Sequence, residues 1–416
     1  MGMTIAEKIL AKNSGRTKVQ AGDIVTVKVD TVVLFDNNFS PTNWQNVLKV
    51  AYPERLVVVL DHRVPAPLVA SASAHMTARS FVERFGIERF HDVGSTQGIC
   101  HQVVADEAYA LPGGVLVCAD SHTCSAGVLN CVARGVGYPD VTYAAVKGET
   151  WFEVGATVRY ELTGALRDGV TTKDVFLHMA GKYGEHATQN LEYGGPALAG
   201  LNINARKTLS TMSAELSCEF ATFEFDDLLA DYLRARGKTA FEAVYPDRDA
   251  GYADVRTIDL SRMEPLVALP DAVINNTCSI ADVHGTRVDQ AFIGSCANGT
   301  IDDLALAARV LAGKRVSPKT RLIGTPGSQE VYRQALKAGI IATLAEAGAV
   351  ITSPTCGACT GNMAVLGPGE TCITASTRNF KGRMGDPSSR VFMASPATVA
   401  ASAITGTITH PLEFLH

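Results

Sequence analysis

Short runs of apolar residues recur along the chain, and each ends where small or polar residues begin. Near-continuous apolar runs predict strands that are buried on both faces, as in parallel sheets covered by helices. Helical patterns fill the intervening segments, so we predict βα units and an α/β fold with mostly parallel sheets. The strand-like runs are Arg55 to Leu60, Val115 to Cys118, Ala291 to Ile293, Arg321 to Ile323, Ala349 to Ile351 and Cys372 to Thr374.

Two of the intervening helices have clear end signals. The first is predicted over Ile301 to Leu311, with Thr300 as its N-cap and with acidic residues in the first turn, where the helix dipole favours them. The second is predicted over Ser328 to Ala338, with the serine as its cap and Gly339 as the stop.

Changes in composition predict soft domain borders. A new unit is expected at the strand-like run Thr157 to Leu162, and another after the Pro/Asp/Gly-rich stretch Tyr245 to Tyr252. These borders divide the chain into residues 1–155, 156–258 and 259–416.

Because ligands of parallel α/β sheets bind beyond the carboxyl ends of the strands, we expect the polar residues that follow the strands to form the site.

Composition excludes several classes of protein. With 46% hydrophobic and 19% charged residues among 416, the chain is typical of a globular protein and not of a disordered one. A formal charge of −5 and the lack of a dense basic cluster argue against nucleic acid as a partner. No window approaches the roughly 20 apolar residues that span a bilayer. We therefore expect a soluble, cytoplasmic protein without a membrane partner.

Three of the ten cysteines stand out by their spacing. Cys296 follows one strand-like run, and Cys356 and Cys359 form a Cys-x-x-Cys pair after another. Four thiolates would close a metal site, whereas three leave one metal position open for a substrate. The other seven are expected to pack as small apolar side chains: Cys100, Cys118, Cys124, Cys131, Cys218, Cys278 and Cys372.

The Cys-x-x-Cys pair alone leaves other interpretations open. It could be a redox pair, half of a zinc site or two buried thiols. A zinc site would need a fourth ligand, for which His284 is the local candidate. A redox pair would not need Cys296.

Further motifs occur in a fixed order around these cysteines. The chain resembles the aconitase superfamily, and in particular the large subunits of isopropylmalate dehydratase, homoaconitase and dimethylmalate dehydratase. The resemblance extends from about Thr4 to about Gly406. The motifs that carry it are Asp61-His62, Gly98 to Gln102, Ala119 to Thr123, Glu192-Tyr193, Gly294 to Gly299, Cys356 to Cys359 and Ser376 to Arg383.

The resemblance implies three α/β/α domains around a central cleft and a [4Fe-4S] cluster bound through Cys296, Cys356 and Cys359. It further implies a hydro-lyase in which the fourth iron acts as a Lewis acid on a hydroxy acid while a positioned acid protonates the leaving hydroxide. His62, oriented by Asp61, is the implied proton donor. Two further implied pairs of histidine and carboxylate lie around the cluster, and they are His101 with Asp120 and His122 with Glu192.

The substrate is expected to be a di- or tricarboxylic acid, since guanidinium groups are suited to bidentate carboxylate binding. Arg378 and Arg383 are the predicted carboxylate anchors, and Ser121 and Asn298 are predicted hydrogen-bonding residues near the cluster. By resemblance the lead substrate is 3-isopropylmalate, of leucine biosynthesis, with homoaconitate and 2,3-dimethylmalate as alternatives.

The resemblance also implies a partner. Full-length aconitases have a fourth, swivelling domain with the catalytic base, and we expect a separate small subunit to supply it, so that this chain is active only in a heteromer. Three segments depart from the usual leucine-pathway pattern and leave the substrate open: Phe35 to Trp44, Leu209 to Phe220 and Thr300. A non-catalytic metal- or RNA-binding homologue is the alternative from a different class.

Overall fold

The structure is a computed structural model that describes residues 2–415. Its first unit is built on a parallel five-stranded sheet in the order β4-β3-β2-β5-β6, flanked by the antiparallel ribbon β1-β7. The strands are β1 (Ile24–Lys28), β2 (Thr31–Phe35), β3 (Leu56–Val59), β4 (Arg89–His91), β5 (Val115–Cys118), β6 (Val132–Gly135) and β7 (Glu149–Glu153). The helices of this region are α1 (Ile5–Ser14), α2 (Val69–Phe85), α3 (Cys100–Asp106) and α4 (Tyr138–Lys147).

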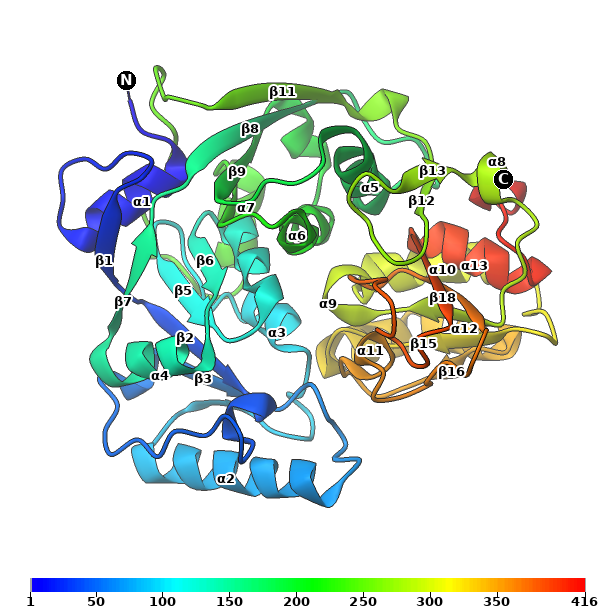
Figure 1. Cartoon of the computed structure of the whole chain (residues 1–416), viewed down its shortest axis with the longest axis horizontal. Coiled ribbons are helices and arrows are strands. Elements are labelled where there is room, and N and C mark those ends of the chain that lie inside the picture. The colour runs from blue at the N-terminus through cyan, green and yellow to red at the C-terminus, as the bar shows by residue number, and fades with distance from the viewer. Residues whose placement is uncertain (1, 416) are drawn as a thin grey trace.

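The second unit has a parallel four-stranded sheet in the order β10-β9-β8-β11. Figure 1 shows β8 and β11 passing over the top of the molecule, with α5 and α6 beneath them. The strands are β8 (Ala156–Thr163), β9 (Gln189–Gly194), β10 (Ala221–Phe223) and β11 (Asp254–Asp259). The helices are α5 (Thr172–Tyr183), α6 (Ile203–Met212) and α7 (Asp227–Arg234).

The third unit has a seven-stranded sheet in the order β13-β12-β18-β17-β14-β15-β16, in which β12 is antiparallel to both of its neighbours and the other pairs are parallel. It lies on the right in Figure 1. The strands are β12 (Leu266–Ala268), β13 (Thr277–Ser279), β14 (Gln290–Ile293), β15 (Arg321–Gly324), β16 (Val350–Ile351), β17 (Thr371–Thr374) and β18 (Arg390–Ala394). The helices are α8 (Ile280–Val283), α9 (Ser295–Asn298), α10 (Ile301–Leu311), α11 (Gln329–Lys337), α12 (Ile340–Ala347) and α13 (Pro396–Thr405).

The predicted elements agree with these bounds. All six apolar runs contain a strand, and the helix over Ile301 to Leu311 is α10, where Thr300 and Asp303 cap each other's backbone. Ser328 caps α11 as predicted. Gly339, with a φ of 75°, lies between α11 and α12 and allows the chain to turn from one helix into the next. The α/β fold with mostly parallel sheets is therefore confirmed.

One apolar core joins the first two units. It contains residues from both sheets, such as Val33, Cys118 and Tyr193. The 3-10 segment η3 (Ser121–Leu129) packs against α6 and β10, and at Gly127 the approach is so close that a Cβ atom would lie 1.8 Å from the Ala221 carbonyl oxygen. The division at residue 155 stays a prediction, because the two sheets share this core.

Across residues 2–415, no helix is long and apolar enough to cross a bilayer.

Candidate active site and cysteine centre

The candidate site lies where carboxyl ends of strands from the first and third units meet. His62 follows β3, and Cys356 follows β16. The segments after these strands are bonded directly, since Thr355 Oγ1 donates to the Asp61 carbonyl oxygen at 2.9 Å and the Cys356 amide donates to the same oxygen at 3.3 Å. The fold therefore places the predicted histidine and cysteine side by side, although 294 positions separate Thr355 from Asp61.

His62 is held between two carboxylates. Its Nδ1 lies 2.6 Å from Asp61 Oδ1, and its Nε2 lies 3.3 Å from Asp120 Oδ2. The second oxygen of Asp61 accepts from the Cys100 amide at 2.8 Å, which fixes the carboxylate. Burial opposes a charge on the imidazole, but Asp61, Cys356 and Asp120 together raise the pKa of His62 well above its usual value. His62 is therefore set up as a protonated imidazole, able to donate a proton.

Asp120 binds the second predicted histidine. Its Oδ1 lies 2.6 Å from His101 Nε2 and accepts from the His122 amide at 2.8 Å. Burial would raise the pKa of Asp120, but His101, His122 and His62 hold it well below its usual range. The predicted pair of His101 and Asp120 is present, and Asp120 links three histidines through one ionised carboxylate.

The predicted pair of His122 and Glu192 does not form. His122 Nε2 lies 2.8 Å from Glu215 Oε1, in η5 (Ser213–Leu216), which directly follows α6. Burial opposes the charge of both groups, yet the pKa of His122 is raised by Asp120 and Glu215, and that of Glu215 is lowered by His122 and Arg378. Glu215 is therefore the carboxylate that orients His122.

Glu192 belongs to a different polar network. It lies in the interior strand β9, where its oxygens accept from the Ile5 amide at 2.8 Å and from Arg159 Nη1 at 2.9 Å, and Tyr252 donates to it as well. These contacts tie α1 to the four-stranded sheet. Glu192 is thus fully occupied by structural bonds, which is why it is not available to His122.

The three predicted cysteines are buried in the same region. Cys296 lies in α9 directly after β14 and forms a small cluster with Ile99 and Cys356. Cys359 lies 3.5 Å from Thr377 Oγ1 and 3.8 Å from Arg383 Nη2. Burial disfavours a thiolate at Cys359, but Arg383 and Thr377 lower its pKa below the ordinary value. The thiolate, which is the metal-binding form, is therefore easier to form at Cys359 than at Cys296 and Cys356, where burial raises the pKa.

The three sulfurs do not form a compact site for a single ion. In residues 2–415, the ligand atoms of Asp61, His62 and Cys356 lie within 4.8 Å of one another, whereas those of the three cysteines do not. Each thiolate of an iron-sulfur cube binds a different iron, so such ligands stand farther apart than those of one ion. The donor set fits a three-thiolate cluster with an open position.

Two buried polar atoms next to the cysteines lack a protein partner. They are Asn298 Oδ1 and Arg383 Nε. The Asn298 amide nitrogen donates to Asp303 at 3.0 Å, which turns its oxygen away from that carboxylate. They are two of seven such atoms among the described residues, and because they lie in the motifs around the cysteines they are available to a ligand of the site.

Arg378 and Ser121 meet at the edge of the site. Arg378 Nη2 donates to Ser121 Oγ, and its Nε donates to Glu215, both at 2.8 Å. Arg378 thus joins the third unit to η3 and η5. Its remaining guanidinium nitrogen leaves this arginine able to bind a carboxylate.

Two carboxylates of the site were missed at the level of sequence. Besides Glu215, Asp36 accepts from the His62 amide at 3.1 Å and the Arg63 amide at 2.8 Å and so fixes the turn that carries His62. Both lie in segments that we treated as departures, Phe35 to Trp44 and Leu209 to Phe220. An acid retained inside each of them was the signal that could have found these residues.

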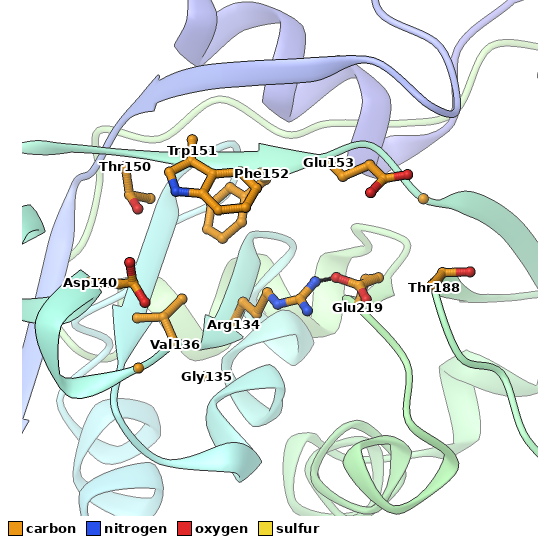
Figure 2. A pocket seen from close by; sticks show the side chains of 12 residues that line it. Arg134, Gly135, Val136, Asp140, Thr150, Trp151, Phe152, Glu153, Thr188 and Glu219 are labelled. Atoms are coloured by element: carbon orange, nitrogen blue, oxygen red, sulfur yellow. Dashed lines mark ion pairs between the residues drawn. The ribbon is translucent and has the colours of Figure 1, made fainter.

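A separate cavity of about 330 Å³ lies beyond the carboxyl end of β6. Figure 2 shows the Trp151 ring on one side and the ion pair of Arg134 and Glu219 on the other. None of the predicted site residues lines it. Its wall at Gly135 packs against the backbone of Asp120 and Ser121, so this cavity lies behind the site.

Comparisons with known proteins cover nearly the whole chain. A sequence model described as "Aconitase family (aconitate hydratase)" matches residues 16–279 and 272–406. The 3-isopropylmalate dehydratase large subunit of Mycolicibacterium smegmatis is 52% identical over 410 residues, covering 98% of this chain and 97% of that protein. The 3-isopropylmalate dehydratase large subunit 1 of Methanopyrus kandleri is 43% identical over 423 residues and 100% of both chains. The probable methanogen homoaconitase large subunit of Methanothermobacter thermautotrophicus is 39% identical over 422 residues, which cover 99% of this chain and 98% of that one.

Proposed function

Because this chain belongs to the aconitase family, we propose that it is the large, catalytic subunit of an iron-sulfur hydro-lyase that dehydrates a malate-type hydroxy acid reversibly. The observation that carries the proposal is His62, which is held between Asp61 and Asp120 and lies beside Cys356. A charged imidazole next to a buried thiol suits protonation of a leaving hydroxide at a metal centre.

The proposed cofactor is a [4Fe-4S] cluster bound by Cys296, Cys356 and Cys359. When bound, it supplies a Lewis acid that makes hydroxide a better leaving group. His62 donates the proton to that hydroxide, and Asp61 keeps the imidazole oriented and charged. The negative charge of Asp120 stabilises the same imidazolium from the other side.

Substrate binding is assigned to the residues around the cluster site. Arg378 binds a carboxylate of the substrate, and Glu215 and Ser121 hold its guanidinium in place. Arg383 Nε and Asn298 Oδ1, which are unpartnered, supply a donor and an acceptor to the ligand. A dicarboxylate with one hydroxyl matches this set of groups.

The lead substrate is 3-isopropylmalate, which the names of the 52% and 43% identical relatives support. Homoaconitate is the second candidate, supported by the 39% identical homoaconitase large subunit. The partner is a small subunit, since these relatives are all named large subunits and this chain matches 97% or more of each. We propose that this partner covers the site, supplies the proton-abstracting base and limits activity to the heteromer.

The test is anaerobic purification with the candidate small subunit, followed by iron and sulfide analysis and assays with 3-isopropylmalate, homoaconitate and 2,3-dimethylmalate. Iron and sulfide in near-equal amounts, with turnover of one acid only in the presence of both subunits, would support the proposal. Near-stoichiometric zinc without sulfide would reject it and favour a non-catalytic metal-binding homologue. Turnover of homoaconitate alone would replace the lead substrate and leave the reaction class intact.

A further inference from the structure

Two lysine side chains are completely buried near the three cysteines. Lys173 lies in α5 and Lys207 in α6, and both have an exposed fraction of 0%. Lysine is almost never fully buried unless it is paired with an opposite charge. Their position inside the protein therefore requires a physical explanation.

The hydrogen-bond partners of these two ammonium groups are neutral. Lys173 Nζ donates to the carbonyl oxygens of Ser376 at 2.7 Å and Ala375 at 3.1 Å, and it lies 3.4 Å from Met212 Sδ. Lys207 Nζ donates to the side-chain oxygen of Gln102. Among the described residues, no carboxylate forms an ion pair with either lysine. The bonds satisfy the N–H groups but leave two positive charges without a direct counter-charge.

An unpaired buried ammonium is costly. Even after relaxation, transfer of one such ion into a protein interior carries a large desolvation cost. Burial lowers the pKa of Lys173 to about 8, although Cys359 and Asp303 act in the opposite direction. Burial likewise lowers the pKa of Lys207, against the effect of Asp106 and Cys296.

The packing places both lysines beside the cysteine segments. Lys173 bonds the backbone just before Thr377, whose Oγ1 lies 3.5 Å from the Cys359 sulfur. Thr208, next to Lys207, donates from its Oγ1 to the carbonyl oxygen of Ala297, next to Cys296, at 2.9 Å.

Lys173 also holds the backbone of the loop that follows β17 and carries Arg378. The two carbonyls that it binds come directly after β17 and directly before Thr377 and Arg378. Thr377 lies against the Cys359 sulfur, and Arg378 is the proposed carboxylate anchor. A single side chain from the second unit therefore fixes the loop of the third unit that faces both cofactor and substrate.

We propose that Lys173 and Lys207 are counter-charges for the anionic cluster held by the three cysteines, and that Lys173 is in addition a positioning residue for the Arg378 loop. The inference rests on the proposed function, because a cube bound by three thiolates is the anion that the lysines stabilise. Such a cube becomes more negative on reduction, so nearby positive charges favour the reduced form. A purely structural lysine would affect folding but not the reduction potential.

The experiment compares wild type with Lys173→Met, Lys173→Arg and Lys207→Met. Lys182→Met is the matched control, because Lys182 is an exposed lysine of the same helix α5. The midpoint potential of the cluster is measured in the anaerobic heteromer, together with KM and kcat. In the cluster-free chain, the rate at which iodoacetamide alkylates Cys359 is followed by mass spectrometry at about pH 8, where a nearby cation promotes the thiolate.

We expect Lys173→Met to lower the midpoint potential, to slow Cys359 alkylation about tenfold and to raise KM through the loosened Arg378 loop. Lys173→Arg should restore the potential, and Lys207→Met should lower it without the same rise in KM. Lys182→Met should match wild type. If folded Lys173→Met and Lys207→Met both keep the wild-type potential and alkylation rate, the proposal is wrong.

Failure of this inference can be told apart from failure of the proposed function. Should Lys173→Met not fold, Lys207→Met decides the question by the midpoint potential. A wild-type protein that binds no iron or sulfide would refute the proposed function and with it the role of the lysines as cluster counter-charges. A wild-type cluster with a normal assay, combined with unchanged lysine variants, would refute only the present inference.

Discussion

Glu215 Oε1 lies 2.8 Å from His122 Nε2, and the same oxygen accepts from Arg378 Nε at 2.8 Å. One carboxylate therefore orients both a candidate acid-base group and the candidate substrate anchor. The two partners come from different units of the fold, so Glu215 couples the geometry of η3 to that of the loop after β17. Loss of its charge should disturb both at once.

Glu215→Gln is expected to reduce kcat about a hundredfold, since a neutral amide no longer favours the imidazolium of His122. The measurement is steady-state kinetics of the reconstituted heteromer. Glu192→Gln is the control, because Glu192 is also an acid in the interior but bonds Arg159 and Tyr252. It should cost about 1–3 kcal/mol of stability and leave kcat nearly unchanged. A larger loss of kcat in the Glu192 variant would reverse the assignment made here.

Cys359→Ala should abolish stable iron binding, because the cluster site would keep only two thiolates. Cys372→Ala is the matched control: this cysteine is also completely buried, but it lies within β17 and packs in the apolar core. The control should keep its iron and lose roughly 1–3 kcal/mol of stability through the cavity it leaves. Iron and sulfide per chain and thermal unfolding are the two readouts. Equal iron content in the two variants would remove Cys359 from the ligand set.

Gly127→Ala should strongly destabilise the protein, because its Cβ atom would lie 1.8 Å from the Ala221 carbonyl oxygen. The helical segment η3 would have to move away from β10, at a cost of about 1–3 kcal/mol or more. His122, at the start of η3, would move with it and activity would fall. Gly200→Ala, which meets nothing within 4 Å, should change stability by less than about 0.5 kcal/mol. Urea unfolding and activity assays compare the pair.

Asp174 gives a prediction for the pH dependence of stability. Burial raises its pKa from 3.8 to about 6, despite bonds from Thr171 and Leu266. A carboxyl group whose pKa is higher in the folded than in the unfolded chain contributes its full stabilisation of the fold at pH values below the unfolded pKa. This contribution is lost as the pH rises through the folded pKa. The Asp174→Asn variant has no ionisable group at this position. Its free energy of unfolding relative to that of the wild type should therefore rise by up to about 3 kcal/mol between about pH 4 and about pH 7.

Urea midpoints of the two proteins at these pH values check that prediction. Other titrating groups contribute equally to both proteins and cancel in the difference. A difference in stability that does not change with pH would show that Asp174 ionises normally in the folded chain.

The sequence by itself determined the elements of the chain and indicated its chemistry. Apolar runs must be buried and helix ends must be capped, so the strands that precede His62, Cys296 and Arg378 and the cap at Thr300 could be located locally. The spacing of the three cysteines and the order of the motifs indicated an open metal site. Strand ends and helix caps are local signals, and the cysteines and motifs were recognised by their order along the chain, so none of these needed knowledge of the packing.

Tertiary structure alone decided which distant groups are partners. Nothing local distinguishes the acids Glu192 and Glu215. The direction in which β9 and η5 face assigns one to Arg159 and the other to His122. The same holds for Lys173, whose charge meets Ser376 across two units. A hydrogen bond depends on distances of a few ångströms, and contacts between segments far apart in sequence are fixed only when the sheets and helices pack together.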